Sequence, residues 1–102
     1  MPELPEVETI RAFLDERVRG KAITAVEIGL PRLIKNTTAD RFAAALTGQT
    51  LEGVERRGKY LFVRCRGPWS FLVHLRMTGS LLYEDKPGQY EGRAIHITFV
   101  LS

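Results

Sequence analysis

The first residues of the chain could supply a reactive amine. Removal of Met1, which is normal when a small residue follows it, would leave Pro2 with a free secondary amine. An α-amino group has a pKa of about 7.7–8.0, so a usable fraction is unprotonated near neutral pH. Such an amine can attack an electrophilic sugar carbon and form an iminium ion, in the manner of a Schiff-base lysine. Glu3, beside it, could act as a general acid or base.

A run of positive charge is the second candidate feature. Residues 56–83 contain no acid, and aromatic residues lie among the bases. The bases of this run are Arg56, Arg57, Lys59, Arg64, Arg66 and Arg76. This pattern is typical of a surface that faces phosphate groups. The alternative is a pair of strands with solvated charges, and the charge pattern alone favours neither.

Composition indicates one compact domain and excludes several classes of protein. The chain has 102 residues, of which 44% are hydrophobic and 26% charged, with a net charge of +3. No apolar run approaches the roughly 20 residues that span a bilayer, and Glu6 and Glu8 stand where a secretory signal would be basic. A cytoplasmic location without membrane contact is therefore expected. The single cysteine, Cys65, excludes an internal disulfide, and its apolar neighbours predict a buried, inert thiol.

The apolar pattern predicts two helices. Apolar residues at spacings of three and four predict a helix over residues 5–19, with Pro5 at its first position. A shorter helix is predicted over residues 39–47, capped by Thr37 or Thr38. A glycine follows each segment as a natural terminator.

The rest of the chain favours strands. Residues 21–30 are rich in Ile and Val, and after residue 48 the apolar period changes to two. Strands are predicted over residues 21–30, 51–57, 59–64, 70–76, 80–83 and 95–101. The fold class is therefore α+β: an antiparallel β-sandwich or barrel-like sheet with an N-terminal helix and one short second helix. The last strand runs to Ser102 without a tail, so residues 1–102 are expected to be a single-domain fragment.

Three motifs resemble one enzyme family. Residues 2–9 read PELPEVET and resemble the N-terminal signature of the formamidopyrimidine-DNA glycosylase family at all eight positions. Residues 56–61 (RRGKYL) are similar to the family's segment with a lysine on an early strand. Residues 74–81 (HLRMTGSL) are similar to its His-Leu-x-Met-[Ser/Thr]-Gly-Ser-Leu segment. The motifs occur in the family's order, and a weaker likeness follows around His96.

The resemblance implies base-excision DNA repair. Family members remove oxidised purines, chiefly 8-oxoguanine and formamidopyrimidines, after flipping the damaged nucleotide out of the duplex. Pro2 would attack C1′ of the sugar, and the resulting iminium intermediate would also allow strand cleavage by elimination. Glu3 would protonate the sugar ring oxygen. The expected enzyme is therefore both a glycosylase and a lyase at abasic sites.

The resemblance also assigns supporting roles. Lys59 would lie near the lesion, as part of the catalytic set, and hold a backbone phosphate. Glu6 would support the site by steadying the helix start rather than through chemistry. Met77 would be a wedge that fills the gap left by the flipped base, whereas without the motif it would be assigned to the core. The expected DNA-binding residues are His74, Arg76, Met77 and Arg32.

Other family features fall outside this sequence. They are two further wedge residues, a helix–two-turn–helix domain and usually a four-cysteine zinc finger. Zinc is therefore expected only in a missing C-terminal domain. No cofactor or metal is expected in residues 1–102. The expected partner is double-stranded DNA with oxidised purines or abasic sites, and the protein is expected to bind it as a monomer. The enzymatic activity of the isolated fragment should be impaired. Two alternatives stay open: a non-catalytic DNA-binding module of the same fold, and a tautomerase that uses Pro2 as a general base.

Overall fold

Helices and strands alternate before a run of strands, as the sequence predicts. The structure is a computed structural model that describes residues 4–75, 81–85, 89–90, 92 and 94–102. The elements in chain order are α1 (Leu4–Val18), β1 (Ile23–Ile28), the 3-10 helix η1 (Pro31–Leu33), α2 (Ala39–Leu46), β2 (Leu51–Arg57), β3 (Tyr60–Cys65), β4 (Ser70–His74) and β5 (Ile97–Leu101). None of the described helices is long and apolar enough to cross a membrane.

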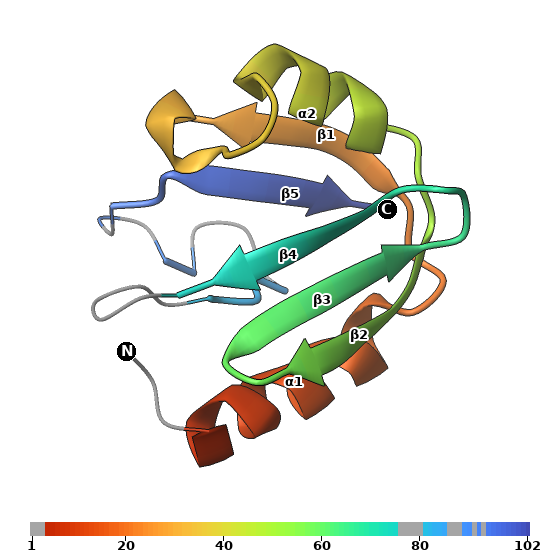
Figure 1. Ribbon diagram of the computed structural model, residues 1–102, viewed down its shortest axis with the longest axis vertical. Helices are drawn as coiled ribbons and strands as arrows, with labels where there is room; N and C mark the ends of the chain where they lie inside the picture. The colour runs from red at the N-terminus through yellow and green to blue at the C-terminus, as the bar shows by residue number, and fades with distance from the viewer. Residues whose placement is uncertain (1–3, 76–80, 86–88, 91, 93) are drawn as a thin grey trace.

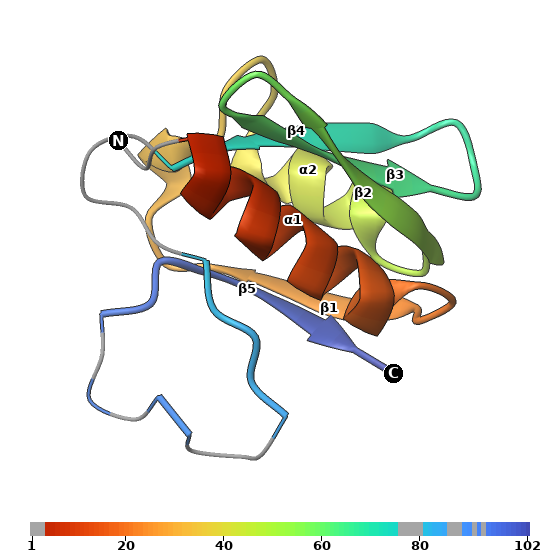
Figure 2. The ribbon, with the colours of Figure 1, turned by 90° about the horizontal axis from the view of Figure 1, so that it is seen from below.

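The strands form two antiparallel sheets. One sheet pairs β1 with β5, and the other has the order β2-β3-β4. Figures 1 and 2 show the sheets as two layers, with α1 along one open side and α2 along the opposite side. The expectation of an α+β fold dominated by antiparallel sandwich-like sheets is confirmed.

The core lies between the layers and draws on both helices. Its buried residues are Val7, Leu14, Val18, Ile23, Leu46, Leu51, Val54, Leu61, Val63 and Cys65. Phe71 of β4 stacks on Phe99 of β5 with ring centroids 5.0 Å apart, and Phe42 of α2 meets the edges of both rings. This aromatic cluster joins the two sheets and α2, since each ring comes from a different element.

The helix boundaries follow the predicted signals. At α2 the side chain of Thr38 accepts a hydrogen bond from the backbone N–H of Arg41 at 3.1 Å, which is the N-cap interaction predicted from sequence. Gly20 follows α1 with φ of 80° and Gly48 follows α2 with φ of 93°, a region that glycine enters without steric cost. Both terminators are therefore confirmed.

Several strand predictions need correction. The first strand is shorter than residues 21–30, and the last begins at Ile97 rather than Ile95, which is exposed. Residues 81–83 form no strand, and residue 80 lies outside the described part. Lys59, predicted on a strand, instead lies in the turn between β2 and β3. Alternating apolar residues thus overstate strand length wherever no neighbouring strand supplies hydrogen bonds.

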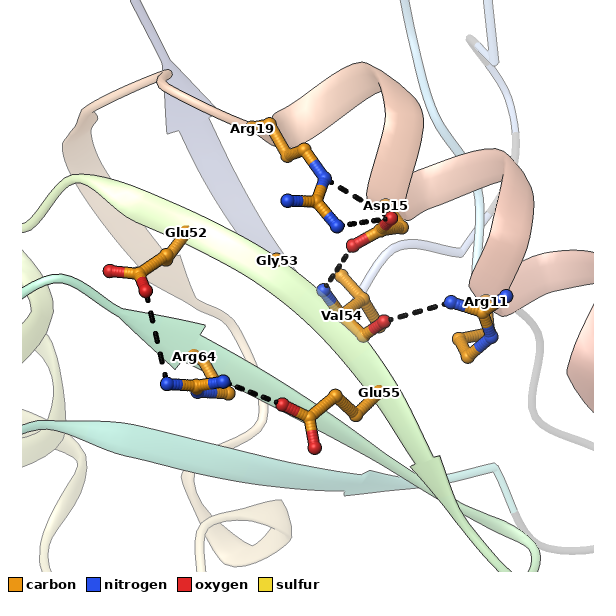
Figure 3. Close-up of a pocket in the computed structure, with 8 residues that line it drawn as sticks. All are labelled: Arg11, Asp15, Arg19, Glu52, Gly53, Val54, Glu55 and Arg64. Carbon is orange, nitrogen blue, oxygen red and sulfur yellow. Dashed lines mark hydrogen bonds and ion pairs between the residues drawn. The ribbon is translucent and has the colours of Figure 1, made fainter.

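The free edge of β2 is covered by side chains of α1 (Figure 3). The backbone N–H of Val54 donates to Oδ1 of Asp15 at 2.8 Å, and its carbonyl accepts from Arg11 at 3.2 Å. A Cβ atom on Gly53 would come within 2.9 Å of the same Asp15 oxygen, so a larger residue there would displace the Asp15 carboxylate from this position. A strand edge that would otherwise expose unpaired backbone groups is thereby closed without another strand.

The Asp15 carboxylate should contribute to stability in a pH-dependent way. Burial alone raises its pKa, but the hydrogen bond from Val54 and the ion pair with Arg19 outweigh burial, and the net pKa is lowered. A lowered folded-state pKa means that the stabilisation is complete above the unfolded-state pKa of about 3.9 and is lost as pH falls through the lower folded-state value.

Asp15→Ala should therefore lower the free energy of unfolding by about 1–3 kcal/mol at pH 7, because Val54 keeps a buried N–H without a partner. Urea unfolding measures this, and the difference from wild type should narrow below about pH 4. Glu16→Ala, on the exposed face of the same helix, should change stability by less than about 0.5 kcal/mol. Equal stability of the Asp15 variant and wild type at pH 7 would contradict the edge-capping role.

Candidate nucleic-acid interface

Lys59 is presented by a tight hairpin turn. Arg57 and Tyr60 pair at the ends of β2 and β3, and Gly58 and Lys59 form the two-residue connection between them. Gly58 has φ of 61°, as the first central position of a type II′ turn requires. The Lys59 side chain is exposed at the tip of this turn. An ammonium group in this position is available to an anion that approaches from solvent.

The turn is held against α1 by a set of ion pairs. Nε of Arg56 donates to Glu8 of α1 at 3.1 Å, and another guanidinium nitrogen of Arg56 donates to the carbonyl of Gly58 at 3.1 Å. Glu8 also pairs with Arg11 at 2.7 Å. The hydrogen bond from Arg11 is the main reason that the pKa of Glu8 is lowered; burial opposes it and Arg56 supports it. Arg56 thus links the carbonyl within the turn to the N-terminal half of α1.

The turn consequently lies beside the start of α1 (Figures 1 and 2). Pro2 and Glu3, the predicted nucleophile and acid, lie outside the described residues and are attached to this end of the helix through Leu4. Glu6 is exposed in the first turn of α1, a position where a carboxylate favours the helix dipole. Its predicted structural role is consistent with this place.

His74 lies at the same end of the sheet as Lys59. It ends β4 directly opposite Tyr60, and the two rings are in contact, with centroids 4.7 Å apart. Arg76, predicted to share a strand face with His74, and Met77, predicted in the loop that follows, lie outside the described residues. Arg32 is exposed in η1, which follows β1 in the other sheet, so it comes from a different layer than Lys59 and His74.

The basic run of residues 56–83 is less uniform in space than in sequence. Arg64 pairs with Glu55 at 2.8 Å and with Glu52 at 3.8 Å, and Arg56 pairs with Glu8. These acids precede the run in sequence. Within the described part of the run, Lys59 is exposed at the turn, whereas Arg56 and Arg64 form ion pairs with acids of α1 and β2. The phosphate-facing surface stays a prediction.

Two hollows on the surface are lined by these paired charges. Figure 3 shows the first, between α1 and β2, where Asp15 and Arg19 face the Arg64 pairs. The second lies next to it, around Glu8 and Arg56. The charged side chains around both hollows form ion pairs with one another or hydrogen bonds with the backbone of β2. We therefore interpret the hollows as parts of the contact between α1 and the sheet rather than as reaction sites.

The described residues offer no alternative centre for metal or thiol chemistry. No group of three or more His, Cys, Asp or Glu side chains within them could hold a metal ion. Cys65 is buried, and burial raises the pKa of its thiol, as expected for an inert cysteine.

Sequence reasoning missed the residues that support the site. Glu8 and Arg11 are three apart on one helix, a spacing typical of an ion pair, and this signal was available. The Arg56 link and the ring contact of Tyr60 depend on strand register and on how α1 packs. Neither can be read from spacing along the chain.

Comparison with known proteins identifies the class. A profile described as the formamidopyrimidine-DNA glycosylase N-terminal domain matches residues 1–102. The class is therefore that of a DNA-glycosylase N-terminal domain. The chain belongs to the formamidopyrimidine-DNA glycosylase family, which sets aside the tautomerase alternative.

Comparisons with individual relatives support the same family. The formamidopyrimidine-DNA glycosylase of Carboxydothermus hydrogenoformans is 44% identical over 99% of this chain and 38% of its own length. That of Symbiobacterium thermophilum is 48% identical over 99% of this chain and 32% of its own. The crystal structure of the Lactococcus lactis enzyme bound to DNA with an abasic site has a TM-score of 0.82 at 36% identity, and the match covers 99% of this chain and 38% of that one. The chain thus spans about a third of the relatives' length.

The Glu8–Arg56 link should hold the Lys59 turn in place. Glu8→Ala removes the acceptor on α1, so the turn should open more often and its amides at residues 57–60 should exchange hydrogen severalfold faster. Hydrogen–deuterium exchange measures this, with Glu16→Ala as a control on the exposed side of the helix. Unchanged exchange at the turn in the Glu8 variant would refute the link.

Proposed function

We propose that this chain is the N-terminal catalytic domain of a base-excision DNA glycosylase that removes oxidised purines and cleaves the strand at the resulting abasic site. One observation carries the proposal: the whole chain matches the family's N-terminal domain, and Pro2 of the PELPEVET motif directly follows a methionine, Met1. Loss of Met1 would make that proline the amino terminus and supply the amine that the chemistry needs.

The proposed reaction begins with the lone pair of the Pro2 nitrogen. It attacks C1′, and the bond from C1′ to the base breaks, so that the base leaves with the bonding electrons and gains a proton. The attached nitrogen then loses its proton to solvent, its lone pair opens the C1′–O4′ bond to give an iminium ion, and Glu3 donates a proton to O4′. The iminium acidifies the C2′ proton; its loss to solvent expels the 3′ phosphate and cleaves the strand.

Two features of the described residues support a phosphate-binding role for Lys59 and His74. Lys59 and His74 share one end of the three-stranded sheet, and the Arg56–Glu8 link holds the Lys59 turn at the start of α1. A cation fixed before the substrate arrives loses less freedom on binding than one on a mobile loop. We assign Lys59 and His74 to backbone phosphates of the damaged strand, and Arg32 and Arg76 to more distant contacts.

The solved relatives suggest the substrates. Lactococcus lactis formamidopyrimidine-DNA glycosylase has been solved with DNA containing FAPY-dG, and a MutM protein with DNA containing carbocyclic 8-oxo-G. We propose the same lesions for this protein, flipped out of the duplex, with Met77 in the gap. Because this chain spans about 38% of that Lactococcus enzyme, it should bind damaged duplex more weakly alone than with further DNA-binding segments.

A borohydride-trapping experiment tests the nucleophile. Protein without Met1 should form a covalent adduct with abasic DNA through Pro2, whereas protein with an N-terminal tag should form none, because an amide nitrogen has no lone pair to donate. Intact-mass analysis should show loss of one methionine in the reactive form. A trapped adduct at Pro2 in tagged protein would contradict this mechanism, and DNA binding without any adduct would favour the non-catalytic module.

The phosphate role of Lys59 predicts a change in salt dependence. Lys59→Ala, in the longest form of the protein that its gene encodes, should weaken binding to abasic duplex and reduce the slope of log K against log salt by about one, since one counterion is released per neutralised phosphate. Arg41→Ala, on the opposite helix α2, should leave the slope unchanged. An unchanged slope and unchanged excision in the Lys59 variant would remove both of its proposed roles.

A further inference from the structure

One row of side chains crosses the three-stranded sheet next to the Lys59 turn. Arg57 of β2 lies opposite Tyr60 of β3, and Tyr60 lies opposite His74 of β4. Directly opposed residues of antiparallel strands project from the same face of a sheet. Since Leu61, the next residue of β3, is buried in the core, this row faces outward.

Each basic side chain of this row rests on an aromatic ring of β3. The guanidinium carbon of Arg57 lies 4.0 Å from the centroid of Phe62. The His74 ring lies 4.7 Å from the Tyr60 ring, centroid to centroid, with the planes tilted by 51°. The row therefore combines two groups that can bind anions with two rings that restrict how those groups move.

Packing in the core does not explain why an aromatic residue occupies position 60. Its side chain is 46% exposed, and it contributes nothing to the buried cluster, while the adjacent Leu61 is only 1% exposed. Its ring contact among the described residues is with His74. A half-exposed ring against one imidazole removes some of the rotamers that the imidazole would otherwise sample, which lowers the entropy lost when it binds a ligand.

We propose that Tyr60 is a positioning residue whose ring holds the His74 imidazole toward a DNA backbone phosphate beside Lys59. The proposal rests on the proposed function, because it requires that His74 contacts DNA. The hydroxyl of Tyr60 has no part in it. The ring supplies the contact, so phenylalanine should serve as well as tyrosine.

A double-mutant cycle tests this in the longest form of the protein, with binding to a duplex that holds a stable abasic-site analogue. Tyr60→Leu should weaken binding on the order of two- to tenfold, the factor that corresponds to the strength of one aromatic pair. Tyr60→Phe should bind as wild type does. In a His74→Ala background, Tyr60→Leu should have no further effect, which a general loss of structure would not produce. Leu72→Ala, exposed one row away on β4, is the matched control and should bind normally.

The outcomes separate the two proposals. Equal losses from Tyr60→Leu with and without His74, or a loss in Tyr60→Phe as large as in Tyr60→Leu, would overturn the positioning role while leaving the proposed function intact. No binding of the abasic duplex by wild-type protein would overturn the proposed function and this inference with it. Melting temperatures of all variants show whether any loss of binding reflects unfolding.

Discussion

The edge of β2 that faces α1 has no neighbouring strand, and the fold depends on how that edge is satisfied. Arg11 and Asp15 lie one turn apart on α1, and they present a donor and an acceptor, respectively, to the backbone C=O and N–H of Val54. The helix thereby substitutes for a strand in hydrogen bonding and also buries its apolar stripe in the core. Gly53 permits this approach, because any side chain there would meet the Asp15 carboxylate.

The contact between α1 and β2 also connects the two segments that carry the proposed active-site residues. Pro2 and Glu3 are attached to α1, whereas Lys59 belongs to the hairpin that continues from β2. The start of α1 and the Lys59 turn lie at one end of the domain because α1 contacts β2 along its length, through Glu8 near the start of the helix and Asp15 near its end. Displacement of α1 would therefore change the position of the Lys59 turn relative to the start of the helix.

Much of this fold could be predicted from local signals, and the remainder could not. The helix predicted over residues 5–19 is observed at residues 4–18, and Thr38, one of the two predicted caps, does cap α2; both follow from apolar periodicity and from the preferences of single residues. The position of Lys59 in a turn depends on where β3 begins to pair. The neutralisation of Arg56 and Arg64 depends on acids that approach in space, and the role of Tyr60 on register. Composition and periodicity carry no information about such contacts.

The burial of Cys65 bears on the function proposed for this domain. Peroxide reacts with thiolate rather than thiol, and a cysteine that is shielded from solvent and whose pKa is raised is seldom in the reactive form. The only sulfhydryl group of the chain is thus protected from the same oxidants that create 8-oxoguanine. This domain should keep its structure under the conditions in which lesions of that kind accumulate, without depending on cellular reductants to regenerate a modified cysteine.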